Sequence, residues 1–132
     1  MSDLGGRTVF FVKDAERARH FYVESLGFAL DWTHEEDGKL FVFQVSLLGF
    51  PLILNQTETW TEGRAGHGRV FFGLDDDQID AFRQHIQGRN IKTEVMHWGA
   101  PTLVIRDLDG NEFFFWYPES ARASLAAEPP GN

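Results

Sequence analysis

The alternation of apolar and polar positions predicts one strand–helix–strand–strand–strand unit in the first half of the chain. Residues 7–12 are a β-branched and aromatic run, which predicts a buried strand. Asp14 follows as a candidate helix N-cap, apolar residues recur at helical spacing as far as Leu26, and Gly27 is placed to end the helix. Three further strands are predicted at residues 28–33, 40–47 and 52–54.

The same order starts again after a polar, glycine-rich linker at residues 56–66. Residues 69–74 predict a strand, Asp75 begins a cap region, and an apolar stripe closed by Gly88 predicts a helix. Three more strands are predicted at residues 91–98, 102–106 and 112–117. We therefore predict an internal repeat of one βαβββ unit, with modules at about residues 5–55 and 67–118.

Both modules are expected to lie in one domain, residues 1–119. Residues 120–132 carry Ala, Pro and Gly without an apolar period, and we expect them to form a flexible tail. The last strand has aromatic residues at nearly every position, so both of its faces must be covered. Alternate positions should meet different layers, with Phe114 and Trp116 on one face and Phe113, Phe115 and Tyr117 on the other.

Composition restricts the possible functions. The formal net charge of −8 argues against nucleic acid as a partner, because no basic stripe exists to neutralise phosphates. The absence of cysteine excludes disulfides, thiolate catalysis and cysteine-bound metal. No apolar run approaches the ~20 residues of a membrane span, and the chain does not begin with a signal-peptide pattern, so we expect a cytoplasmic protein without a membrane partner.

Two motifs carry a family resemblance. Val12-Lys13-Asp14, followed by Phe21-Tyr22 and Leu26-Gly27-Phe28, lies in the first module, and Asp107-x-Asp109-Gly110-Asn111 closes the second. Together they resemble the glyoxalase, bleomycin-resistance and extradiol-dioxygenase superfamily, also called vicinal oxygen chelate, over about residues 7–117. The sequence departs from the family at Leu108, where proline is usual. The resemblance implies an α+β fold in which paired modules form a U-shaped, partly open mixed sheet around a cleft, with helices on the outer face. It also implies a homodimer, commonly with one chain's module paired with its partner's.

Metal-dependent members of this family place His, Glu or Gln on the first and last strands of each module. The matching positions here are Arg7, Leu52 or Ile53, Arg69 and Phe114, and arginine cannot donate a lone pair to a metal. We therefore expect no metal and no cofactor. A shift of two residues along the strands would instead offer His67 and Glu112, which leaves a fallback metal site with two ligands.

The same positions suit binding of a small molecule. Arg7, Val9 and Phe11 should share one face, and Arg69 and Phe71 the equivalent face of the second module. An aromatic cleft with two arginines suits a planar or π-rich ligand, held by stacking and by hydrogen bonds to an acidic or carbonyl group. Alternatively, Phe114 and Trp116 are simply part of the core. The full candidate ligand-binding set is Arg7, Val9, Phe11, Ile53, Trp60, His67, Arg69, Phe71, Trp98, Phe114 and Trp116.

Three hypotheses follow from these residues. The first is a metal-free protein that binds and sequesters a small molecule, similar to the bleomycin-resistance branch, in which a Trp-Gly pair like Trp98-Gly99 precedes the closing strands. The second is a metal-dependent lyase, isomerase or dioxygenase that uses His67 and Glu112. The third is a cofactorless enzyme with His67 or His97 as general base beside an arginine that stabilises an oxyanion. The sequence leaves open whether the modules pair within one chain or between chains.

Overall fold

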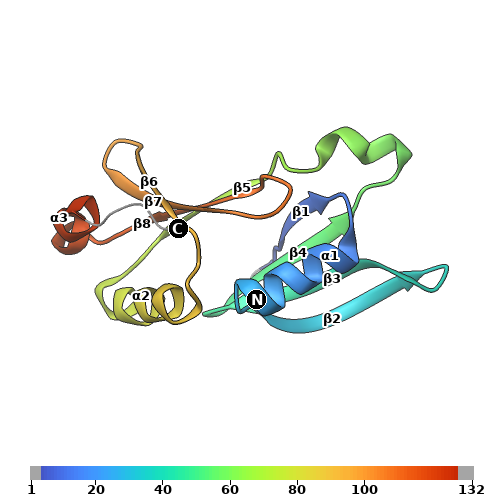
Figure 1. Ribbon diagram of the computed structural model, residues 1–132, viewed down its shortest axis with the longest axis horizontal. Coiled ribbons are helices and arrows are strands. Elements are labelled where there is room, and N and C mark those ends of the chain that lie inside the picture. Colours follow the sequence, from blue (N-terminus) through green and yellow to red (C-terminus); the bar gives the residue numbers. More distant parts are fainter. Residues whose placement is uncertain (1–3, 128–132) are drawn as a thin grey trace.

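A computed structural model describes residues 4–127, with side chains through Ala123 (Figure 1). The first module contains β1 (Thr8–Val12), α1 (Ala15–His20), a π-helical turn η1 (Phe21–Ser25), β2 (Ala29–Glu36), β3 (Lys39–Leu47) and β4 (Phe50–Gln56). A 3-10 helix η2 (Thr59–Arg64) lies in the linker. The second module contains β5 (Arg69–Gly73), α2 (Asp76–Arg89), β6 (Glu94–His97), β7 (Pro101–Arg106) and β8 (Glu112–Trp116), and α3 (Glu119–Ala127) follows it.

The predicted α+β class with two βαβββ units is confirmed. Each module forms its own four-stranded mixed sheet, which we call sheet 1 (order β1-β4-β3-β2) and sheet 2 (order β5-β8-β7-β6). In both sheets the first strand of the module pairs in parallel with the last, and the other pairs are antiparallel. Within the described part of the chain, β1 and β5 are therefore edge strands.

One face of each sheet contributes to a single core that both modules share. Phe10 of β1 lies beside Leu54 and Phe43 in the register of sheet 1, and all three are buried. Phe10 packs against Phe113 of β8 with ring centroids 5.4 Å apart, and Phe113 also contacts Phe28 from the first module. Because successive residues of a strand point to opposite faces, the other face of each sheet turns away from this core. We call these the open face of sheet 1 and the open face of sheet 2.

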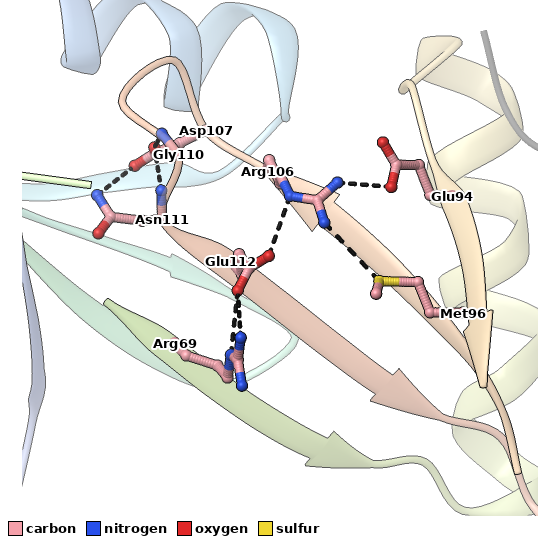
Figure 2. A network of polar contacts seen from close by, with 8 residues as sticks. All are labelled: Arg69, Glu94, Met96, Arg106, Asp107, Gly110, Asn111 and Glu112. Atoms are coloured by element: carbon pink, nitrogen blue, oxygen red, sulfur yellow. Dashed lines mark hydrogen bonds and ion pairs between the residues drawn. The ribbon is translucent and has the colours of Figure 1, made fainter. Parts of the chain in front are cut away.

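The Asp-x-Asp-Gly-Asn turn of the second module joins it to the first. One carboxylate oxygen of Asp107 accepts the backbone N–H groups of residues 109–111, each at 2.9 Å, and the other accepts the hydroxyl of Tyr22 at 2.8 Å. The side chain of Asn111 accepts the backbone N–H of Gly68 at 2.8 Å and donates to the carbonyl of Phe11 at 3.0 Å. Figure 2 shows this turn at the start of β8. These buried hydrogen bonds make the motif a structural connection between β1, η1 and β8.

The helix ends follow the predicted chemistry with one correction. Asp14 caps α1 by accepting the backbone N–H of Arg17 at 3.1 Å, and Gly27 has a left-handed φ of 77°. The second helix does not end at Gly88, as predicted, because it continues through Arg89 and ends at Asn90 with a φ of 54°. Asparagine tolerates the left-handed conformation, so it can serve in place of glycine.

The end of the chain also differs from the prediction. We expected a flexible tail at residues 120–132, but Glu119–Ala127 forms the helix α3. The hydroxyl of Ser120 in this helix donates to the carboxylate of Asp76 in α2 at 2.8 Å, a tertiary contact that composition alone does not reveal. Residues 128–132 lie outside the described residues. None of the helices at residues 4–127 is long and apolar enough to cross a bilayer.

Candidate functional site

Four aromatic side chains meet on the open face of sheet 2. Phe71 of β5 contacts Trp98, in the β6–β7 turn, at a centroid distance of 5.3 Å and Trp116 of β8 at 5.2 Å. Trp98 contacts Phe114 at 5.2 Å. All three contacts are edge-to-face, a favourable geometry for aromatic rings. We call Phe71, Trp98, Phe114 and Trp116 the aromatic cluster.

The aromatic cluster is separate from the core. Phe114 is only 4% exposed, yet it belongs to the open face, because it lies opposite Phe71 in the register and both alternate with core residues. Phe71 and Trp98 remain 43% and 47% exposed. An exposed aromatic surface of this kind is typical of a binding site. Phe114 is buried, as the core alternative predicts, but neither Phe114 nor Trp116 belongs to the core that the two modules share, which packs on the other face.

A row of four charged side chains crosses the same face beside the aromatic cluster (Figure 2). Arg69 of β5 donates to one oxygen of Glu112 at 2.9 and 3.0 Å, and Arg106 of β7 donates to the other oxygen at 3.0 Å. Arg106 also pairs with Glu94 of β6 at 2.6 Å. The hydrogen bond to Glu94 raises the pKa of the Arg106 guanidinium, and the hydrogen bond to Glu112 raises this pKa by a smaller amount. We call these four residues the charged row.

The charged row is neutral as a unit, because two guanidinium groups meet two carboxylates. Arg69 also lies over the ring of Phe114, with 4.7 Å between the guanidinium carbon and the ring centroid. Its position is therefore fixed by an ion pair and by a cation–π contact. Both arginines of the charged row are already paired, so an anionic ligand that approaches the row would have to compete with Glu112.

The open face of sheet 1 carries a hydrogen-bonded chain of polar groups. Arg7 donates to Gln44 at 3.1 Å, and Gln44 donates to Asp31 at 2.9 Å. Ser46 donates to the other carboxylate oxygen of Asp31 at 2.9 Å. Val9, Phe11 and Ile53 share this face by register.

Sequence reasoning missed the residues that partner Arg7. The alternation of polar side chains along β3 is the signal that could have placed Gln44 and Ser46 on one face. Asp31 gave no such signal, because an irregularity in the pairing of β2 with β3 between Leu30 and Trp32 brings it to this face.

The linker helix η2 adds a third segment beside sheet 1. The guanidinium of Arg64 lies 5.6 Å from the ring of Phe11 and 5.7 Å from the ring of Trp60. Trp60 donates its indole N–H to Glu58 at 2.9 Å and is otherwise largely exposed. Arg64 therefore connects the predicted ligand-binding residues Phe11 and Trp60, although sequence reasoning did not select it.

The predicted site residues fall into two groups on different faces. The predicted residues on sheet 1 and on sheet 2 do not line one cleft within a single chain, because the open faces of both sheets turn away from the shared core. The sheet 2 group is Arg69, Phe71, Trp98, Phe114 and Trp116, and the sheet 1 group is Arg7, Val9, Phe11, Ile53 and Trp60. His67 lies between them at the end of the linker and is exposed.

The donor set does not suit a metal ion. Both oxygens of Glu112, one of the two fallback ligands, accept hydrogen bonds from arginines. Among the residues that the structure describes, no three His, Asp or Glu side chains are grouped so that they could hold a metal. The candidate bases His67 and His97 are exposed, and neither ring has a hydrogen-bond partner within residues 4–123 that would orient it.

Comparisons with known proteins agree on the fold. The model of the Glyoxalase/Bleomycin resistance protein/Dioxygenase superfamily matches residues 6–115. The structure resembles TnmS3, an antibiotic binding protein from Streptomyces sp. CB03234, with a TM-score of 0.60 and 24% identity over 90% of this chain and 100% of that chain. The bleomycin-binding protein from Streptomyces verticillus, complexed with copper(II)-bleomycin, has a TM-score of 0.64 and 21% identity over 90% of this chain and 99% of that chain.

An enzyme has a similar fold as well. Lactoylglutathione lyase from Agrobacterium tumefaciens has a TM-score of 0.57 and 18% identity over 88% of this chain and 94% of that chain. At these identities the solved structures establish the fold alone. No curated protein matches the sequence.

Proposed function

Because the chain belongs to the Glyoxalase/Bleomycin resistance protein/Dioxygenase superfamily, we propose that it binds and sequesters a planar aromatic small molecule without reacting on it. The observation that carries this proposal is the aromatic cluster, in which Phe71 and Trp98 remain exposed on the open face of a sheet. Flat aromatic rings gain most from stacking on such a surface. Arginine at positions 7 and 69, where metal-dependent relatives need a lone pair, supports binding over metal catalysis.

The cleft of this proposal is formed by two copies of the chain. A ligand site needs a second wall, and the two open faces of one chain point away from their shared core. Val9 and Trp32 are exposed on the open face of sheet 1, as Phe71 and Trp98 are on sheet 2, and β1 and β5 are edge strands of their sheets within the described residues. A symmetric homodimer places sheet 1 of one copy opposite sheet 2 of the other, which encloses two equal clefts.

The charged row favours an uncharged ligand. Arg69 and Arg106 share Glu112, and Arg106 also binds Glu94, so the charged row offers no net charge to an acidic group. An anion would have to break an existing charge-assisted pair before it gained a new one. We therefore propose a neutral planar ligand, for which the row serves as a polar rim beside the aromatic cluster.

Binding is tested by titrating the protein with 2-aminoanthraquinone, anthraquinone-2-sulfonate and copper(II)-bleomycin while tryptophan fluorescence is recorded. We expect the neutral quinone to bind more tightly than its sulfonate and to be recovered unchanged by mass spectrometry. Trp98→Ala should weaken binding roughly tenfold or more, since the loss of one stacking partner costs about 1 to 3 kcal/mol. Leu108→Ala, an exposed apolar truncation in the β7–β8 turn, is the control. The proposal of sequestration would be wrong if the protein converts the ligand chemically. It would also be wrong if the protein binds stoichiometric metal tightly and loses an enzymatic activity when the metal is removed.

The two-copy cleft has a separate test by subunit mixing. Phe11→Ala damages the wall from sheet 1, and Trp98→Ala damages the wall from sheet 2. When the two weakly binding variants are unfolded together and refolded, random pairing should restore full affinity at roughly a quarter of the sites, because each mixed dimer has one intact cleft. A cleft within one chain would give no recovery at all.

A further inference from the structure

The C-terminal helix α3 lies beside the aromatic cluster but outside the part of the chain that the family model matches. That match ends at residue 115, and α3 spans Glu119–Ala127. Figure 1 shows α3 at the end of sheet 2. Ser120 binds Asp76 of α2, and Ala121 packs against the core, so the start of the helix is held in place.

From this position Arg122 extends over Trp116. Its guanidinium carbon lies 5.1 Å from the Trp116 ring centroid, and its Nε donates to the carbonyl of Tyr117 at 3.2 Å. Neither contact involves a carboxylate partner. A cation–π contact near solvent is weak, so a ligand that packs against the indole can take the place of the guanidinium.

Trp116 itself holds an unused hydrogen-bond donor. Its indole Nε1 is buried, and no acceptor reaches it within the described side chains. A buried indole N–H usually has a partner, and leaving it without one costs free energy. Gly99 also lies near the same indole, since a Cβ added there would be 3.7 Å from Cζ2, but a backbone segment cannot swing aside as the long side chain of Arg122 can.

We propose that Arg122 is a displaceable cover over Trp116, and that a planar ligand replaces it so that a ring carbonyl, such as that of a quinone, meets the edge of the indole and accepts the Trp116 N–H. This inference rests on the proposed function, because it assigns the ligand's polar edge to the same aromatic cluster. It adds a residue from outside the family match to the site. It also narrows the ligand from any flat aromatic to one that carries an acceptor oxygen.

The cover is tested without any ligand. In a background with Trp32, Trp60 and Trp98 replaced by Phe, emission comes from Trp116 alone, and acrylamide quenching measures its accessibility. Arg122→Ala should raise the quenching constant roughly twofold, because a local cover over a buried ring is lost. Leu108→Ala, an exposed apolar truncation in the β7–β8 turn that leaves the contacts of α3 in place, is the control and should change nothing. Equal quenching in Arg122→Ala and the parent would overturn the inference.

The donor is tested with two matched compounds, 2-aminoanthraquinone and 2-aminoanthracene, which differ in the two ring carbonyls. Trp116→Phe should lower affinity for the quinone roughly five- to tenfold more than for the hydrocarbon, as expected for one lost hydrogen bond. Equal losses for both compounds would overturn the inference while leaving the proposed function intact. No binding of either compound to the wild-type protein would overturn the proposed function and the inference together.

Discussion

The buried hydrogen bond between Tyr22 and Asp107 offers a sharp test of how the two modules are joined. Tyr22 is fully buried in the first module, and its hydroxyl donates at 2.8 Å to a carboxylate oxygen of Asp107 in the second. Tyr22→Phe removes this hydroxyl and leaves the aromatic ring in place, so packing against Phe28 and Phe113 is retained. The change therefore isolates one polar contact between the modules.

The expected loss is about 1.5 to 2 kcal/mol of unfolding free energy. Hydrogen bonds to charged groups contribute roughly 1.5 to 3 kcal/mol, and the lower part of that range applies because Asp107 keeps four other donors. Ser120 donates to Asp76 at the same 2.8 Å, but this hydroxyl–carboxylate pair is exposed. Ser120→Ala should therefore cost no more than about 0.5 kcal/mol.

The pH dependence gives a second signature. Burial, and then the charge and hydrogen bond of Asp107, raise the pKa of the Tyr22 phenol well above its ordinary value. The folded state then holds this proton more tightly than the unfolded state does. The contribution to stability is complete below about pH 10, where an unfolded tyrosine titrates, and is lost as the pH rises further towards the folded pKa. The difference between wild type and Tyr22→Phe should shrink in that alkaline range.

The measurement is equilibrium unfolding in urea, followed by circular dichroism at one fixed protein concentration, since the stability of the proposed dimer would depend on concentration. Wild type, Tyr22→Phe and Ser120→Ala are compared at pH 7 and at several values above pH 10. A Tyr22→Phe loss no greater than that of Ser120→Ala would refute the role assigned to burial in this contact.

Three further predictions concern the same turn and the charged row. Asn111→Ala should destabilise the fold by about 3 kcal/mol in urea unfolding, because the N–H of Gly68 loses its partner and the bonds that Asn111 donates to Phe11 and Asp107 are lost; a loss under ~1 kcal/mol would contradict the connection. Burial raises the pKa of the Asp109 carboxyl, so the protonated group favours the folded state at low pH, and this contribution is lost as the pH rises through the folded pKa. Asp109→Asn should therefore be more stable than wild type at pH 7 and equally stable in acid, as measured by thermal unfolding. Glu112→Gln leaves the charged row with a net positive charge, so the affinity for anthraquinone-2-sulfonate should rise about tenfold. Added salt should reduce this gain. If the row does not contact the ligand, neither effect will be seen.

Sequence reasoning predicted much of this molecule because its strongest signals are local. Hydrophobic alternation and helical spacing are set by neighbouring residues, so both βαβββ units and the N-cap at Asp14 could be predicted. The same alternation placed Phe114 and Trp116 on one face of the last strand. The helix at Glu119–Ala127 escaped prediction because its contacts with Asp76 and Trp116 are tertiary.

The sequence alone determined which side chains share a face of the regular strands, because a period of two follows from strand geometry, but it did not do so in β2, where the pairing is irregular at Asp31. Only the tertiary structure decided what those faces do. It brought Glu112 between two arginines from different strands, which removed Glu112 as a free metal ligand and made the charged row neutral. The tertiary structure also turned the helix-covered faces of both sheets towards one core, so the open faces point apart. The sequence did not reveal this arrangement, because strand pairing and packing depend on residues that are far apart along the chain.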